Sequence, residues 1–177
     1  MQKITRKLTL LLASAISLTA LSQCTTKSPA DIQPVSQFQL DRYLGTWYEI
    51  ARLDHSFERG LENISANYSQ NPDGTVKVIN RGFKTATQQW QEAEGKAKFV
   101  ADPTTGHLKV SFFGPFYGSY IIFELDHKGY QYALISGPNK NYFWLLARTP
   151  ELDAKLQSEL INLAKAKGFA TDQLIFP

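Results

Sequence analysis

The chain has 177 residues, a formal net charge of +3, 43% hydrophobic residues and a single cysteine. Three of its 19 lysines and arginines lie within residues 1–23, which contain no acid, so the other 16 basic residues balance the 16 acidic ones. A domain without excess positive charge lacks the electrostatic footprint of a nucleic-acid-binding protein. One cysteine also excludes an internal disulfide, and the residues after position 23 suffice for one domain with a sizeable core.

Residues 1–23 have the pattern of an export signal. Three basic residues precede an apolar run over 8–21, which is short for a bilayer span but typical of a secretory signal. The run leads into Leu-Ser-Gln-Cys, which resembles a bacterial lipoprotein signal with Gln23 in place of the usual small residue. The resemblance implies that Cys24 becomes the lipidated N-terminus of an outer-membrane protein. The alternative is an ordinary signal followed by an unrelated cysteine.

The remainder divides into a polar stretch and a patterned domain. Residues 24–39 are polar with two prolines, which predicts a flexible tether to a domain over 40–177. In the domain, short β-branched and aromatic runs alternate with turn signals, and short connections imply antiparallel neighbours. The predicted strands are 47–53, 64–70, 75–83, 90–100, 107–113, 119–126, 130–136 and 142–147.

One helix is predicted after the last strand. Thr149 supplies a cap and Pro150 the first helical position, leucines follow at helical spacing, and Gly168 ends the helix. Residues 174–177 are expected to add a final short strand. This order of elements predicts an all-β fold, an eight-stranded up-and-down antiparallel barrel with the helix packed outside.

An up-and-down barrel places its connections alternately at opposite ends. Strand counting brings Gly45, Trp47, Asp126 and Arg148 to one end, although they are far apart in the sequence. There the Arg148 guanidinium can cover the Trp47 indole, a contact worth about 0.5–2 kcal/mol. We therefore expect a structural closed end that is sealed by the indole.

This ordered set resembles the lipocalin family over nearly the whole chain after the signal. Residues 45–47 (Gly-Thr-Trp) are similar to the family's G-x-W signature, Asp126 and Tyr130 resemble part of its second motif, and Arg148 resembles its third. The stretches YLGTWYEIARLDHSFERGL and KVSFFGPFYGSY are more closely similar to the bacterial outer-membrane lipocalins. The resemblance implies a lipid-anchored, periplasm-facing protein that binds fatty acids or (lyso)phospholipids.

Alternation along each strand predicts which side chains face the barrel interior. The interior of an eight-stranded barrel is either filled by side chains or holds one small ligand. Small inward residues would leave a cavity that aromatic residues line. The alternative is a core filled by side chains, with no cavity. The predicted ligand-binding lumen consists of Tyr68, Val78, Asn80, Ala97, Phe99, Val110, Phe112, Tyr120, Ile122, Ala133, Ile135, Tyr142 and Trp144.

No ionic cage for a charged metabolite is visible in this set. A mostly apolar lumen with a few hydroxyls favours an acyl chain whose polar head stays near solvent. The loops at the other end, opposite the tether, are expected to form the entrance, and their aromatic tip suits a bilayer or a protein partner. The predicted entrance residues are His55, Phe57, Pro115, Phe116 and Tyr117.

These features predict a lipid-binding carrier or store of the bacterial outer membrane, with a fatty acid or lysophospholipid as its ligand. The alternative is an envelope interaction module that uses its aromatic loop while the lumen stays empty. Catalysis finds little support, since His55, His107 and His127 fall at different ends and no nucleophile elbow is present. We predict no cofactor and no metal. Glu49 shares the parity of Trp47 and is expected inside, bonded to a tyrosine or an arginine.

Overall fold

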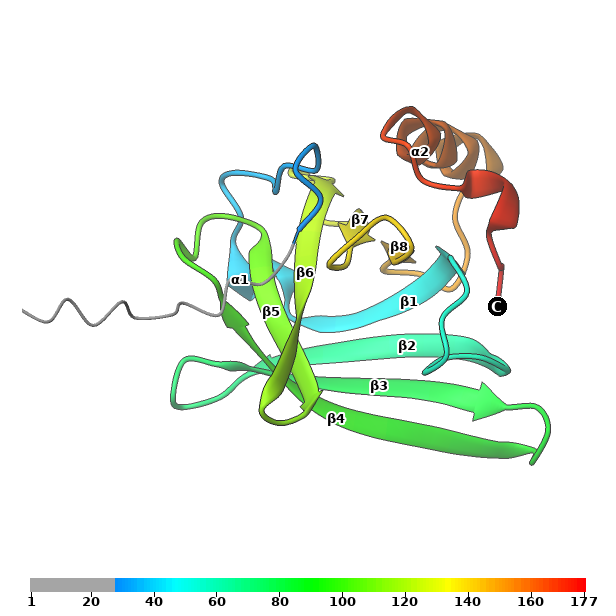
Figure 1. The fold of residues 1–177 in the computed structure, drawn as a ribbon, viewed down its shortest axis with the longest axis horizontal. Coiled ribbons are helices and arrows are strands. Elements are labelled where there is room, and N and C mark those ends of the chain that lie inside the picture. Colours follow the sequence, from blue (N-terminus) through cyan, green and yellow to red (C-terminus); the bar gives the residue numbers. More distant parts are fainter. Residues whose placement is uncertain (1–27) are drawn as a thin grey trace, which may run out of the picture.

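The protein folds into one closed β-barrel, shown in Figure 1 for a computed structural model that describes residues 28–177. Each strand pairs antiparallel with its sequence neighbours, and β1 closes the barrel by pairing with β8. The predicted eight-stranded barrel is confirmed, whereas the predicted signal and Cys24 lie outside the described residues. The strands are β1 (Gly45–Arg52), β2 (Leu61–Gln70), β3 (Val76–Lys84), β4 (Gln89–Phe99), β5 (His107–Phe113), β6 (Phe116–Leu125), β7 (Tyr132–Ser136) and β8 (Phe143–Ala147).

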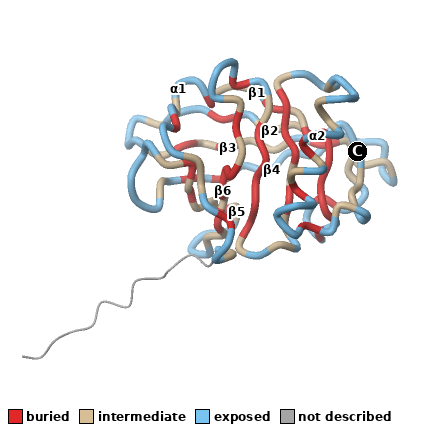
Figure 2. The backbone as a smooth tube through the Cα atoms, turned by 90° about the horizontal axis from the view of Figure 1, so that it is seen from above, coloured by how far each residue is buried: buried red, intermediate tan, exposed pale blue. Residues whose placement is uncertain are grey.

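Two buried layers hold the fold together. One fills the barrel, and the other lies between the barrel wall and the C-terminal helix α2 (Ala154–Ala166). Leu160 and Ala164 of α2 are buried against wall residues such as Phe143. Figure 2 shows the buried stretches running along the strands while the connections are exposed. Alternating inward and outward side chains thus serve two cores, because part of the barrel's outer face is covered as well.

The C-terminal helix begins later than the sequence suggests. Its N-cap is Asp153, whose carboxylate accepts hydrogen bonds from the amides of Lys155 and Leu156 at 3.1 and 3.0 Å. The predicted start at Thr149 and Pro150 is therefore wrong, since a carboxylate cap satisfies two free amides. Gly168 follows the helix with φ of +82°, as its predicted role requires. After the short 3₁₀ helix η1 (Thr171–Gln173), the expected last strand is reduced to one bridge.

The segment before the barrel is packed and not free. Ile32 and Phe38 are 3% and 2% exposed, and Val35 between them exchanges backbone hydrogen bonds with Ile122 and Gly106 at 2.9 and 2.8 Å. The tether predicted over 24–39 is thus wrong from Ile32 onward. Three apolar side chains, three residues apart in a polar stretch, cover barrel surface that strand counting does not reveal.

This N-terminal segment also starts at an unexpected place. Asp31 pairs with Lys140 in the loop between β7 and β8, which is one of the loops at the end opposite Trp47. From there the chain passes β6 and reaches the short helix α1 (Leu40–Tyr43), as Figure 1 shows. The expectation that the entrance loops lie opposite the tether is therefore wrong.

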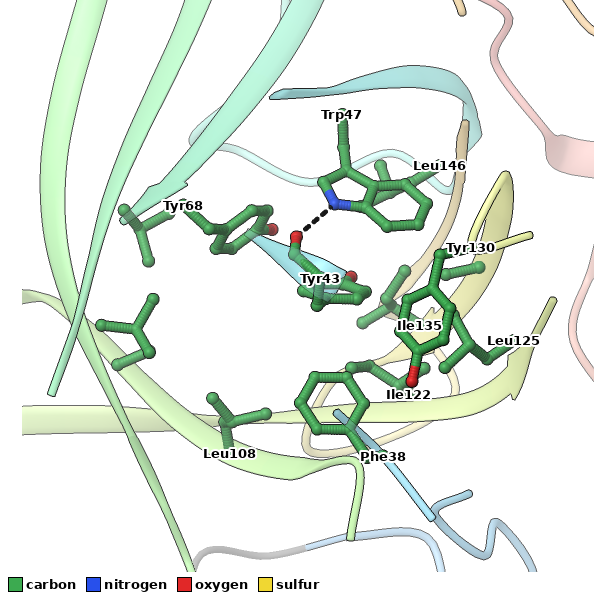
Figure 3. Packing of buried hydrophobic residues seen from close by; sticks show 14 residues of the cluster. Phe38, Tyr43, Trp47, Tyr68, Leu108, Ile122, Leu125, Tyr130, Ile135 and Leu146 are labelled. Carbon is green, nitrogen blue, oxygen red and sulfur yellow. Dashed lines mark hydrogen bonds between the residues drawn. The ribbon is translucent and has the colours of Figure 1, made fainter. Parts of the chain in front are cut away.

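The closed end is built around Trp47 and Arg148. The Arg148 guanidinium lies 4.0 Å from the centre of the indole and donates hydrogen bonds to three backbone carbonyls at 2.6–3.3 Å. The indole N–H donates to the Tyr43 carbonyl at 2.8 Å, as Figure 3 shows. Gly45 has φ of +92°, which favours glycine. Asp126 lies at the same end, where it accepts hydrogen bonds from three amides of its own turn.

A bulge in β1 changes which residues face inward. Glu49 pairs with Leu146 and Ala51 pairs with Leu145, so the register shifts by one residue between them. A shift of one residue moves the following side chains to the other face of a sheet. Ala51 consequently packs toward α2, and Arg52 turns into the barrel.

Candidate functional site

The barrel encloses a chamber of about 100 Å³. At the open end a groove of about 330 Å³ adjoins it, and Phe57, Glu58, Asn80 and Phe112 border both spaces. The chamber alone is smaller than the sites of about 300–1,000 Å³ that hold small molecules, whereas the adjoining groove lies within that range.

Most of the side chains predicted to line the lumen do so. Eight of the thirteen border the chamber: Tyr68, Val78, Asn80, Ala97, Val110, Phe112, Tyr120 and Trp144. Ile122, Ala133 and Ile135 point inward but are fully buried in the interior cluster, away from the chamber. Phe99 packs on Phe38 with ring centres 6.0 Å apart, and Tyr142 lies beside Trp144 at 6.2 Å. A barrel interior is therefore partly lumen and partly solid core.

Leu146, which shares the inward parity of Trp144 on β8, also borders the chamber, and six further lining residues escaped the sequence analysis. Three lie two positions from a predicted lining residue on the same strand, so consistent use of alternation would have found them. The other three come from α1 and from the loop between β1 and β2, for which alternation has no meaning. The six are Ala66, Val76, Leu108, Leu40, Tyr43 and Glu58.

Three linked tyrosine hydroxyls lie on the closed-end side of the chamber. The Tyr120 hydroxyl lies 2.7 Å from that of Tyr43 and 2.9 Å from that of Tyr68. Burial raises the pKa of all three phenols, so they remain protonated. Three hydroxyl hydrogens serve two mutual hydrogen bonds, which leaves one donor for another acceptor.

A buried ionic cluster that the sequence analysis did not predict lies toward the mouth. Arg52 donates to a carboxyl oxygen of Glu49 at 3.3 Å and to the backbone carbonyl of Glu58 at 3.1 Å. The Glu58 carboxylate also accepts the Trp144 indole N–H at 3.1 Å and lies 3.0 Å from Nε2 of His55. Glu49 thus bonds to an arginine, as expected. Both acids border the chamber, so its mouth side is polar while its middle is apolar.

Replacing Glu49 with glutamine is expected to remove a pH-dependent loss of stability. Burial, and then the charge of Glu58, raises the pKa of Glu49 well above its ordinary value, although Arg52 opposes the shift. The folded chain keeps a proton that the unfolded chain releases above about pH 4.3, so stability falls as the pH rises from there toward the raised pKa. The melting temperature of the wild type should decline across this window more than that of Glu49→Gln.

Asp54→Asn provides the control for this measurement. The Arg59 guanidinium beside Asp54 lowers the pKa of that exposed carboxyl, so its effect is confined to pH values below those in which Glu49 titrates. Its profile should therefore parallel that of the wild type at higher pH. If Glu49→Gln also ran parallel, Glu49 would not retain its proton in the fold.

The predicted entrance residues surround the open end with unequal exposure. His55 is buried and stacks on Phe57 with ring centres 4.0 Å apart, while Phe57 itself is exposed. Pro115 and Phe116 are exposed at the β5–β6 turn. Tyr117 on the same hairpin is half-buried, and the amines of Lys98 and Lys109 lie over its ring. The sequence analysis missed Phe113, which is exposed opposite Phe116.

Comparison with known proteins places these features in a family. A model of the lipocalin-like domain matches residues 38–177. The chain belongs to the lipocalin-like family. Among the relatives of this lipocalin is outer membrane lipoprotein Blc of Vibrio cholerae, which is 54% identical over 84% of this chain and 86% of the relative. The protein of the same name from Escherichia coli strain K12 is 44% identical over 94% of both chains.

The fold has a wider distribution than these sequences. Insecticyanin from the tobacco hornworm Manduca sexta matches with a TM-score of 0.67 over 86% of each chain at 20% identity. The match to outer membrane lipoproteins along most of their length places this lipocalin in the bacterial outer membrane as a lipid-anchored protein. Within residues 28–177, no helix has the length and apolar character needed to cross a bilayer.

Proposed function

We propose that this lipocalin is a lipid-binding carrier or store that holds the acyl chain of a fatty acid or lysophospholipid in its lumen for envelope maintenance. The observation that carries the proposal is the chamber's polarity. Its middle is lined by side chains such as Val78, Ala97 and Val110, and its polar groups gather toward the mouth and the floor. An apolar tail fits the middle, and a polar head fits the mouth beside Glu58 and Asn80.

We further propose that Cys24 carries the lipid anchor and that the barrel faces the periplasm. Support comes from the lipoprotein-like sequence that ends at Cys24 and from relatives named outer membrane lipoproteins. A single thiol near the start of an exported chain has no partner for a disulfide, which leaves it free for acylation. Intact-mass measurement of the protein extracted from membranes would test the modification directly.

Filling the chamber should abolish binding. Ala97 is buried, lines the chamber and lies on β4, so Ala97→Phe would place a ring where an acyl chain would lie. We expect the affinity for a fluorescent fatty acid to fall at least about tenfold, which corresponds to about 1.4 kcal/mol. The matched control is Lys96→Phe, the same new side chain on the exposed face one residue away. Both variants should keep the far-ultraviolet circular dichroism of the wild type.

Binding unchanged in Ala97→Phe would show that the lumen does not hold the ligand. Extraction of the wild-type protein purified from membranes, followed by lipid mass spectrometry, gives a second readout that needs no probe. A stoichiometric lipid in the wild type that is depleted from Ala97→Phe supports the carrier. Protein that is free of lipid and fails to bind the probe would favour the interaction module with an empty lumen.

A further inference from the structure

We infer that the open end of the barrel docks on the surface of the lipid bilayer to which the chain is anchored, with the phenyl rings at its rim inserted. Phe113 and Phe116 are 80% and 79% exposed on the β5–β6 hairpin, and Phe57 is 56% exposed on the loop after β1. Together these three residues form the aromatic rim. Large apolar side chains exposed together at one place mark an interaction surface.

The aromatic rim surrounds the way into the chamber. All three phenylalanines border the groove that adjoins the chamber at Glu58 and Phe112. The turn between Phe113 and Phe116 is Gly114-Pro115, so no charge interrupts the tip of the hairpin. A tip of this kind can enter the interfacial region of a bilayer without burying a charged group.

The start of the described chain lies at the same end as the aromatic rim. Asp31 pairs with Lys140, and Tyr142 of the same loop stacks on His55 with ring centres 6.0 Å apart. Cys24 precedes Asp31 by seven residues, which span at most roughly 23–25 Å when fully extended. An anchor at Cys24 therefore holds the open end close to the membrane. This step rests on the proposed lipidation of Cys24 and not on a lipid in the lumen.

Positive charge lies behind the tip. Tyr117 lies on the hairpin that carries Phe113 and Phe116. The amines of Lys98 from β4 and Lys109 from β5 lie 4.8 and 5.7 Å from the centre of its ring. Amines next to an inserted apolar tip can meet the phosphates of anionic lipids at the membrane surface. The apolar tip, its flanking amines and the short reach to the anchor together favour a bilayer over a protein as the surface that is contacted.

A fluorescent label on the rim tests the docking. Phe116→Cys supplies the only free thiol of the mature lipoprotein once Cys24 is acylated, and it can carry an environment-sensitive fluorophore. The matched control is Lys128→Cys, which is exposed in the β6–β7 turn at the closed end. Each lipidated protein is reconstituted into vesicles of phosphatidylethanolamine and phosphatidylglycerol that contain nitroxide-labelled lipids. We expect several-fold stronger quenching and a larger blue shift at position 116 than at position 128.

Equal quenching at the two positions, or stronger quenching at position 128, would overturn the docking. So would a label at position 116 that is unquenched by vesicles but is shielded by a periplasmic protein extract. A second test uses Phe113→Ser combined with Phe116→Ser. This variant should slow transfer of a fluorescent fatty acid from vesicles several-fold and leave uptake of the monomeric fatty acid from solution unchanged. Equal slowing of both processes would instead assign the rim to a lid. The quenching experiment uses no ligand, so its failure is distinguishable from failure of the lumen to bind lipid.

Discussion

Arg52→Ala is expected to lower the free energy of unfolding by about 3–5 kcal/mol, because it removes the cation from a buried ionic cluster. Arg52 is 2% exposed, and its guanidinium contacts the Glu49 carboxyl as well as the backbone and side chain of Glu58. Alanine would leave Glu58 in the barrel without a counter-charge and would remove the hydrogen-bond donor of Glu49, and it would also leave a cavity. Urea unfolding at neutral pH measures the loss.

Two variants separate the ionic effect from the loss of volume. Arg52→Met combined with Glu58→Gln removes the cation and the carboxylate beside it while it keeps most of the packing, so it should recover a large part of the stability. Arg59→Ala breaks an exposed ion pair with Asp54 in the next loop and should change stability by less than about 1 kcal/mol. If Arg52→Ala were as mild as Arg59→Ala, the cluster would make no contribution to the fold.

The sequence contains most of the fold because the barrel repeats one local rule. Alternation along β3, β5 and β8 identifies Val78, Val110 and Trp144 as inward-facing, and turn residues separate the strands at short intervals. Trp47 and Arg148 were brought together by strand counting alone. These predictions require only that consecutive strands be antiparallel.

The parts that could not be predicted depend on breaks in this rule. Simple alternation from Trp47 puts Arg52 on the outer face, and only the bulge between Glu49 and Ala51 brings it inside. A bulge depends on pairing with β8, which is remote in the sequence. Glu58 reaches the chamber from a loop, where no periodicity applies. The ionic cluster at the mouth was missed for these two reasons.

The same limit explains the error at the N-terminal segment. Ile32, Val35 and Phe38 are isolated apolar residues in a polar stretch, so no window of sequence distinguishes them from a tether. Ile32 and Val35 pack beside β6, whereas Phe38 packs on rings of the closed end. These surfaces exist only after the strands have closed. This packing is what brings Asp31 to the open end, and the orientation of the barrel relative to its anchor could therefore not be derived from strand counting.

The second large effect is expected at the closed end, where Arg148→Ala should lower the free energy of unfolding by about 2–3 kcal/mol. The guanidinium covers Trp47 at 4.0 Å and satisfies three backbone carbonyls, so alanine removes a cation–π contact and several charge-assisted hydrogen bonds together. Arg148→Lys keeps the charge but not the planar fork of donors, and it should restore only part of the loss.

A comparison with Arg42 shows how much of this effect depends on burial. Arg42 lies 4.2 Å from the centre of the Tyr130 ring and donates to two carbonyls, but its side chain is exposed, so Arg42→Ala should cost clearly less than Arg148→Ala. A double-mutant cycle of Arg148→Ala with Trp47→Phe should give a coupling of about 0.5–2 kcal/mol. An absent coupling would mean that Arg148 stabilises the fold through its hydrogen bonds to the carbonyls and not through its contact with the indole. Because this pair seals the end remote from the groove, the affinity of the folded variants for a fatty acid should remain that of the wild type.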